Sequence, residues 1–379
     1  MSGCFRHVSV KKNCMLVDAL EVMDDGGLSI LFIIDDEERL IGVFNDIDLR
    51  DALLNIGLMN RTIEHFMNKK PITISIHSTE QEILAIKKKH FAKQIIPVLD
   101  DGGHIVTIEK TRLAGTIYSN PVIILAGGMG KRLMPTTKST PKPMVYINGR
   151  PLLEITVRRL RSQGFRNIYI SLNYRGDQIK EHFGDGSNFG LNIKYIEEPI
   201  KLGTAGPIAL IEKIAEPCLI LNGDVLTKVS FANLINYHLN HGDKLTTSLY
   251  KYDFQVPYGV VGINDCKIIG INEKPVKKFF VNAGIYVMDP CISKYIPKNQ
   301  KYSMTDLIEE LVKRNIAVRG FPLREYWLDI GSQSEYQKAK KEFKQVFEDV
   351  TIRKKQSIAK VEIIKKSKKD MTELAARYD

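Results

Sequence analysis

The sequence predicts an α/β protein, with a mixed and mostly parallel sheet that follows a smaller α+β region. Two observations support this fold class. After residue 121, short apolar runs typical of buried strands alternate with helical periodicity, as expected of a sheet with helices on both faces. Before residue 115, a unit of helix, strand, turn and strand occurs twice. We expect domains over residues 1–115 and 121–347 and a basic tail over residues 348–379.

The first region repeats a short structural unit. Residues 32–44 read as strand, Asp-rich turn and strand, and residues 97–108 repeat this order. A helical stretch precedes each copy, at residues 16–23 and 80–90. One such unit is too small to enclose its own apolar side, so we expect the two copies to pack together.

The second region opens with a strand and a glycine turn. Residues 122–125 form an apolar run of the length expected of a strand buried on both faces. Gly127, Gly128 and Gly130 follow at once. Glycine permits backbone angles and close approaches that side chains resist, so successive amide groups can converge on an anion.

Positive charge and proline follow this turn. The cations are Lys131, Arg132, Lys138 and Lys142. Pro135, Pro141 and Pro143 keep the segment from becoming a helix before residue 151. A strand, a glycine turn and a basic, proline-stiffened loop together describe a cradle for a polyphosphate.

Two other phosphate-binding loops fit less well. The dinucleotide-binding G-x-G-x-x-G turn enters a helix, whereas Gly128-x-Gly130 is followed by Leu133 and a proline-rich loop. A P-loop ends in Gly-Lys-Ser/Thr, which residues 130–132 do not supply. The spacing therefore disfavours both a P-loop and the cofactor loop of an oxidoreductase.

Strands and helices then alternate to the end of this region. The expected helices cover residues 151–163 and 177–183, and the expected strands cover residues 167–172, 191–196 and 217–221. Residues 202–206, LGTAG, are expected to open a helix that reaches Ala215, and Ser332-x-x-Glu335 a helix that reaches Phe347. The strand over residues 217–221 ends in Asn222-Gly223-Asp224, at the kind of strand end where ligands gather in α/β sheets.

Composition places the chain among ordinary globular proteins. No apolar run is long enough to span a membrane, and the N-terminus lacks the apolar core of a signal peptide, so we expect a cytoplasmic protein and no membrane partner. The net charge of +11 is spread along the chain without a nucleic-acid-binding motif, so we expect no nucleic acid partner.

Thiol and imidazole groups suggest neither a metal knuckle nor a nucleophile. The five cysteines lack C-x-x-C spacing, so we expect reduced, partly buried thiols. Cys218 lies inside a predicted strand. His238 and His241 share a predicted helix face, which we interpret as solvated surface rather than as a ligand pair.

Several motifs, in a fixed order over residues 122–342, resemble the sugar-phosphate nucleotidyltransferases, also called nucleotide-sugar pyrophosphorylases. They are LAGGMGKRL at residues 125–133, PKPM at 141–144, LGTAG at 202–206, EKP at 273–275, NAGIY at 282–286 and WLDIG at 327–331. The resemblance implies a Rossmann-like, GT-A-like catalytic domain.

The resemblance also implies roles for individual residues. The implied nucleotide site is Leu125, Ala126, Gly127, Gly128, Gly130, Lys131, Gly203, Thr204 and Ala205. The implied sugar-phosphate site is Gly259, Glu273, Lys274 and Asn282. Asp224 and Asp329 are the implied ligands of Mg²⁺, and the candidate catalytic residues are Arg132, Lys142, Asp224 and Lys274. For residues 202–206, tight packing of small side chains is the alternative.

The repeat of the first region resembles a pair of CBS modules, regulatory units that often bind adenine nucleotides between their copies. In that family a Thr or Ser and an Asp after the last strand contact the ribose. Asp48 matches that Asp, Asn45 stands at the hydroxyl position, and the second copy lacks the Asp. An adenine nucleotide at the pair, and a pair that only packs or dimerises, both stay open.

The chemistry of these residues suits phosphate transfer. A nucleoside triphosphate and a sugar 1-phosphate repel each other, so neutralisation and alignment must supply the catalysis. Asp224 and Asp329 are hard oxygen ligands suited to Mg²⁺. Arg132 can grip phosphate through its planar fork, and Lys142 can act as a point charge.

We therefore expect an enzyme that joins a hexose, hexosamine or heptose 1-phosphate to a nucleoside triphosphate, with GTP favoured, for surface-glycan or nonulosonic-acid precursors. Its products are a nucleotide sugar and pyrophosphate. A member of the family that uses UTP, dTTP or CTP, and a nucleotide-sensing regulator without turnover, are the alternatives. We also expect a homo-oligomer.

Overall fold

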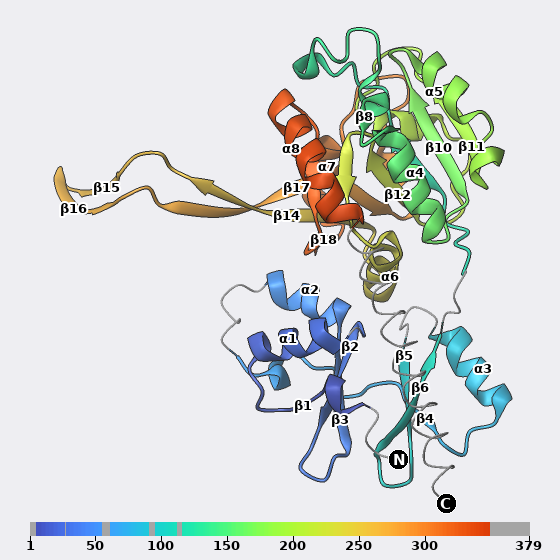
Figure 1. The fold of residues 1–379 in the computed structure, drawn as a ribbon, viewed down its shortest axis with the longest axis vertical. Helices are drawn as coiled ribbons and strands as arrows, with labels where there is room; N and C mark the ends of the chain where they lie inside the picture. Colours follow the sequence, from blue (N-terminus) through green and yellow to red (C-terminus); the bar gives the residue numbers. More distant parts are fainter. Residues whose placement is uncertain (1–4, 27, 55–60, 91–94, 112–115, 349–379) are drawn as a thin grey trace, which may run out of the picture.

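The computed structural model describes residues 5–26, 28–54, 61–90, 95–111 and 116–348, so nearly all of the tail predicted over residues 348–379 lies outside it. Figure 1 shows a larger α/β unit, a long two-stranded arm that leaves it, and a smaller N-terminal α+β unit. The predicted fold class is confirmed.

The N-terminal unit contains two copies of one β-α-β-β arrangement. The first copy is β1 (Ser9–Lys11), α1 (Leu16–Gly26), β2 (Ile30–Ile34) and β3 (Leu40–Asn45), followed by α2 (Asp46–Leu54). The second copy is β4 (Ile74–Ser75), α3 (Glu80–Lys89), β5 (Ile95–Leu99) and β6 (Ile105–Lys110). In each copy the middle strand pairs parallel with the first strand and antiparallel with the third. Ile95, Ile105 and Ile108 pack against the core of the first copy, so the two copies pack together as predicted.

The sheet of the larger unit has the order β11-β10-β7-β12-β17-β14-β18. Its strands are β7 (Val122–Leu125), β10 (Asn167–Leu172), β11 (Asn192–Glu197), β12 (Cys218–Asn222), β14 (Leu245–Gln255), β17 (Val276–Met288) and β18 (Val318–Pro322). Only β17 runs antiparallel to its neighbours. Side chains alternate across β7, so Val122 and Ile124 enter one core and Ile123 enters the other.

Helices cover both faces of this sheet (Figure 1). The core with Val122 includes α4 (Leu152–Ser162), α5 (Gly176–Phe183) and α6 (Phe231–His241), and the core with Ile123 includes α7 (Met304–Lys313). The short strands β8 (Tyr146–Ile147) and β9 (Arg150–Pro151) form a hairpin before α4. As predicted, α8 (Gln333–Phe343) begins after Ser332, and a π-helical turn continues it to Glu348. Within the described ranges, no helix is long and apolar enough to cross a membrane.

Three local predictions are wrong. The helix expected to reach Ala215 is a 3₁₀ turn, Gly206–Leu210. Pro207 can start a helix, but Ile211 has extended backbone angles, so the turn ends at Leu210. His238 is buried rather than solvated, and its Nδ1 lies 2.9 Å from the Thr246 hydroxyl. The four described cysteines are free, but Cys266 and Cys291 are exposed rather than partly buried.

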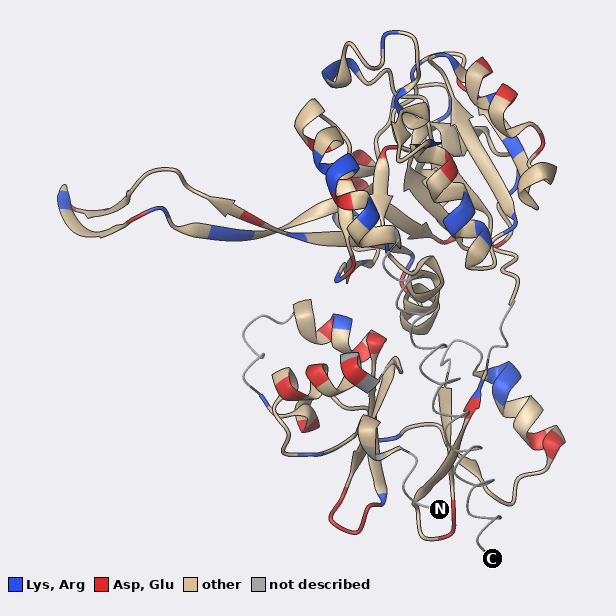
Figure 2. Ribbon diagram, viewed as in Figure 1, with Lys and Arg blue, Asp and Glu red and all other residues tan. Residues whose placement is uncertain are grey.

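The arm, residues 250–281, continues β14 and β17 beyond the sheet. Its tip is a second hairpin of β15 (Val260–Asn264) and β16 (Lys267–Asn272). Nearly all of its side chains are exposed. Figure 2 shows acidic and basic residues interspersed along it, whereas acidic residues gather on α1 and α2 of the N-terminal unit.

A buried arginine joins the N-terminal unit to the larger unit. Arg50 of α2 is 1% exposed, and its guanidinium lies 4.0 Å from the centre of the Phe321 ring. It donates to Asp46 at 2.8 Å, to the Pro322 carbonyl at 2.6 Å and to Glu325 at 2.9 Å. Burial alone would raise the pKa of Glu325, but the charge of Arg50 lowers it.

A second contact across this boundary centres on Asp51. The hydroxyl of Tyr237 donates to Asp51 Oδ1 at 2.5 Å, and His241 Nε2 lies 2.9 Å from Oδ2. Burial alone would lower the pKa of His241, but its hydrogen bond with Asp51 raises the pKa overall. Both units therefore meet through polar groups that compensate one another.

Replacing Arg50 tests how much the contact between the two units contributes to the free energy of unfolding. Arg50→Ala leaves the carboxylate of Glu325 without its cation, so we expect the free energy of unfolding to fall by about 3–5 kcal/mol. Urea titration followed by circular dichroism measures it. Arg39→Ala is the matched control, because Arg39 pairs with Asp35 and Glu37 at the surface and its loss should matter little. Equal effects of the two substitutions would contradict this account.

His241 gives the boundary a pH dependence. Since folding raises the pKa of His241, its contribution is complete below the unfolded value of about 6.5 and is lost as pH rises through the folded value. We expect the Tm advantage of the wild type over His241→Gln to shrink between pH 6 and pH 8. Comparing the two proteins isolates His241 from His238, whose pKa burial lowers and which therefore acts in the opposite sense. A constant difference in Tm would refute the assignment.

Candidate active site

The predicted glycine turn follows the carboxyl end of β7 and packs against the side chain of Lys142. Gly130 has a φ of 63°, and a Cβ there would lie 3.0 Å from the side chains of both Lys142 and Thr137. The buried hydroxyl of Thr137 donates to the Gly130 carbonyl at 2.8 Å. Glycine at this position therefore lets the loop close over Lys142.

Lys142 is buried with its ammonium between two carboxylates. Its Nζ donates to Asp224 Oδ2 and lies 3.8 Å from Asp329 Oδ1. A buried ammonium is costly unless opposite charge compensates it, which these carboxylates do. We call Lys142, Asp224 and Asp329 the Lys–Asp cluster; the structure brings these three predicted residues together.

Two short strands hold the carboxylates in place. β13 (Val225–Thr227) pairs antiparallel with β19 (Trp327–Asp329), with Val225 opposite Asp329. The Ile330 amide donates to the Asp224 carbonyl at 3.0 Å. Asp224 also follows β12, so the pairing of β13 with β19 carries Asp329 to the end of the central sheet.

Asp329 retains an acceptor that the described residues leave unsatisfied. Its Oδ1 is buried and has no hydrogen-bond partner among them. Burial and the charge of Asp224 raise the pKa of Asp329 to about 6, against the opposing charge of Lys142. Two close carboxylates with a spare oxygen fit a divalent cation. No group of three or more His, Cys, Asp or Glu in the described chain could hold an ion alone, so substrate oxygens or water would complete its shell.

Arg132 lies at the edge of the cluster. A Cβ on Gly331 would lie 3.1 Å from Arg132 Nη2, and the charge of Arg132 opposes the rise in the pKa of Asp329. Arg132 and Lys131 are both exposed. The open side of the cluster therefore presents positive charge to solvent.

Residues 202–206 pack against the start of α7. Gly203 has a φ of 82°, and a Cβ there would lie 2.6 Å from the Tyr302 carbonyl oxygen. The same oxygen accepts from the amides of Ala205 and Gly206 at 2.9 and 3.1 Å. The Thr204 hydroxyl accepts from the Met304 amide at 2.8 Å. These contacts show tight packing of residues 202–206, and the nucleotide-binding role implied for Gly203, Thr204 and Ala205 stays a prediction.

Three of the four predicted sugar-phosphate residues lie on the arm. A Cβ on Gly259 would lie 2.8 Å from Glu273 Oε2, so Gly259 and Glu273 are neighbours, and Lys274 follows. All three are exposed, and the arm carries them away from the body of the larger unit (Figure 1). Only Asn282 is at the base, where its Oδ1 accepts from the Gly284 amide at 3.0 Å. The structure therefore does not bring the sugar-phosphate residues to the Lys–Asp cluster of the same chain.

Glu198 is a candidate that the sequence analysis missed. One of its oxygens accepts from the Ser171 hydroxyl, and the other accepts from the Leu202 amide at 3.0 Å. A Cβ on Gly127 would lie 2.6 Å from its Oε1. Glu198 thus ties the glycine turn to residues 202–206. Its position two residues after the strand predicted over residues 191–196 was the available signal.

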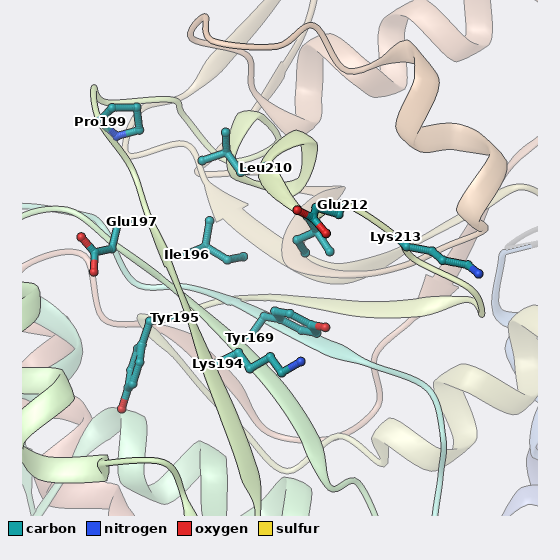
Figure 3. A pocket seen from close by; sticks show the side chains of 10 residues that line it. Tyr169, Lys194, Tyr195, Ile196, Glu197, Pro199, Leu210, Glu212 and Lys213 are labelled. Atoms are coloured by element: carbon teal, nitrogen blue, oxygen red, sulfur yellow. The ribbon is translucent and has the colours of Figure 1, made fainter.

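A surface cavity of 670 Å³ is lined by the two neighbours of Glu198 in the chain, but not by Glu198 itself. Its lining is Tyr169, Lys194, Tyr195, Ile196, Glu197, Pro199, Leu210, Ile211, Glu212 and Lys213. Figure 3 shows Tyr169 and Lys194 side by side, as their cross-strand register requires. None of the predicted site residues lines it.

Comparison with known proteins identifies the family of the larger unit. Residues 121–346, more than half of the chain, match the model of the nucleotidyl transferase family. The chain belongs to the nucleotidyl transferase family. Residues 6–55 match the CBS domain model. Nucleotidyltransferases of this family generally use a divalent metal ion.

Several relatives are similar over the same region. One is a probable mannose-1-phosphate guanylyltransferase 1 of Oryza sativa subsp. japonica, 34% identical over 56% of this chain and 62% of the relative. Another is the mannose-1-phosphate guanylyltransferase catalytic subunit beta of Drosophila melanogaster, 33% identical over 56% of this chain and 60% of the relative. The chain spans less than two thirds of the length of these relatives. HddC from Yersinia pseudotuberculosis, solved with GMP-PN, is 29% identical over 59% of this chain and 99% of that chain, with a TM-score of 0.47.

Two glycines of the nucleotidyl transferase domain differ in the space around them, so their replacement by alanine should affect stability differently. A Cβ on Gly223 would lie 2.9 Å from the Leu125 carbonyl oxygen, so we expect Gly223→Ala to cost about 1–3 kcal/mol of stability. A Cβ on Gly128 meets nothing within 4 Å, so Gly128→Ala should stay within about 0.5 kcal/mol of the wild type. Urea titration measures both, and a large loss for Gly128→Ala would contradict the open turn.

Proposed function

We propose that this protein is a sugar-1-phosphate nucleotidyltransferase. It would transfer a nucleotidyl group from a nucleoside triphosphate, GTP first, to a hexose, hexosamine or heptose 1-phosphate, and release pyrophosphate. Family membership and the guanylyltransferase names of the relatives support the class of reaction and the choice of GTP. The single observation that carries the proposal is the contact of Lys142 with both Asp224 and Asp329 beneath a glycine turn.

The residues of this chain act by position and charge. Amide groups around Gly127 and Gly128 can receive phosphate oxygens, because a side chain at Gly128 would project into open space where an anion can approach. Lys142 and Arg132 neutralise phosphate charge, and the planar fork of Arg132 can orient two oxygens at once. Glu198 keeps the turn in register with residues 202–206.

Asp224 and Asp329 are proposed to hold Mg²⁺. Bound there, the ion would offset phosphate charge during displacement. Lys142 partly compensates the negative charge of the same two carboxylates.

We also propose a separate role for each of the two domains. Residues 1–115 would form the regulatory or oligomerisation domain, with adenine nucleotide as its candidate ligand, and residues 121–347 the catalytic domain. In the first copy, Asp48 accepts from the Asn45 amide at 2.9 Å, and Asn45 accepts from the Ile47 amide at 2.8 Å. The side chains of Asn45 and Asp48 therefore already accept backbone hydrogen bonds at the start of α2.

A pyrophosphate-release screen tests the function. GTP, UTP, CTP, dTTP and ATP are each combined with a panel of sugar 1-phosphates and Mg²⁺, and we expect turnover to be fastest with GTP. Asp224→Asn should lower kcat by at least about 1,000-fold, because the charge that opposes Lys142 is lost. The exposed Asp177→Asn is the control and should keep full activity. Nucleotide binding without turnover for every pair would favour a regulator, and normal turnover by Asp224→Asn would remove the cluster from the mechanism.

A further inference from the structure

The arm has one aromatic face and one polar face. Residues opposite each other in its antiparallel ladder share a face, and the pairs alternate between the two faces. One face carries Tyr250 with Val281, Tyr252 with Phe279, and Phe254 with Lys277. The other carries Lys251 with Phe280, Asp253 with Lys278, and Gln255 with Val276. This alternation is typical of a ribbon with one covered face.

None of the described residues covers the aromatic face. Phe254 and Phe279 are 46% and 49% exposed, and Ile269 at the tip is 70% exposed. Half of the large apolar side chains that the described residues expose lie within residues 252–280. A two-stranded ribbon is marginal in water, and a concentrated apolar surface marks an interaction site.

The arm also holds part of the proposed site at a distance. Gly259, Glu273 and Lys274 lie beyond the ladder, which runs without a register shift from the Leu249–Asn282 pair to the Gln255–Val276 pair. Six residue steps along β14 correspond to about 20 Å. In this structure the ladder holds these three residues away from the body of their own chain.

The base of the arm adjoins the Lys–Asp cluster. The ring of Tyr250 lies 4.7 Å from that of Trp327, whose indole donates to the Ala283 carbonyl at 2.9 Å. Trp327 begins β19, and Asp329 ends it. The aromatic face therefore runs continuously into the strand that carries a candidate metal ligand.

Two-fold symmetry matches these features to a second copy of the chain. When two identical arms lie antiparallel with their aromatic faces in contact, the tip of each reaches the base of the other, because the arms have equal length. Each tip then arrives beside the other copy's Trp327 and Asp329. Aromatic residues would cover aromatic residues, and the missing sugar-phosphate groups would meet the cluster.

We propose that two copies of this chain exchange arms, so that Gly259, Glu273 and Lys274 of one copy complete the Lys–Asp cluster of the other. This inference rests on the proposed function for the identity of the site, but the dimer through the arms does not. The partner is a second copy rather than a different protein, because the arm carries groups that only this site needs.

Mixing two inactive variants tests the exchange. Asp224→Asn disables the body and should lower kcat by at least about 1,000-fold, and Lys274→Ala disables the arm and should lower kcat by at least about 100-fold. In the mixed dimer, one site combines an intact body with an intact arm. Co-expression with two different affinity tags and tandem purification should therefore restore about half of the wild-type rate per dimer. A mixed dimer as inactive as its parents, alongside an active wild type, overturns the proposal.

A second measurement does not depend on activity. Analytical ultracentrifugation should show a dimer for the wild type and a monomer for Phe254→Asp/Phe279→Asp with unchanged circular dichroism. Val312→Asp, at an exposed apolar position of α7, is the control and should stay dimeric. A monomeric wild type, or a dimer that survives the double substitution, refutes the exchange. If the wild type turns over no substrate yet dissociates as described, the proposed function fails and the arm contact stands.

Discussion

The compensation of one buried ammonium by two carboxylates determines how the nucleotidyl transferase domain is arranged. Lys142 needs Asp224 and Asp329 because its charge has little access to water. Meeting that need requires β13 and β19 to pair, and it requires a glycine at position 130 so that the loop can close above the lysine. The glycine turn, the end of β12 and a strand from the far end of the domain are therefore fixed by one electrostatic condition.

Much of this domain could be predicted from local patterns. The apolar run of β7, the glycines after it and the strand before Asp224 each have a signature within a few residues, and the structure places all of them as expected. The strand-end rule indicated Asp224, whereas its meeting with Asp329 was implied only by the resemblance of the motifs around the two residues. The packing of the two N-terminal copies follows from the same kind of reasoning about apolar surface.

The features that escaped prediction depend on distant contacts. The sequence around Arg50 does not indicate that this side chain will donate a hydrogen bond to the Pro322 carbonyl. The sequence around His238 does not indicate that this side chain will be buried beside Thr246. The alternation of Tyr250, Tyr252 and Phe254 is visible in the sequence, but the sequence does not indicate that β14 outgrows its sheet. Glu198 was missed because one of its partners, Ser171, lies 27 residues away in strand β10.

The Arg50 contact has a consequence for anyone who isolates the catalytic half. Cutting the chain between residues 115 and 121 removes Arg50 and Asp51. Glu325 then loses its cation, the Phe321 ring loses the guanidinium that lies over it, and the Tyr237 hydroxyl loses its acceptor. The newly exposed surface would combine an aromatic patch with a carboxylate that has no counter-charge, which favours aggregation during purification. A shortened version should therefore carry a neutral polar residue in place of Glu325, or retain α2.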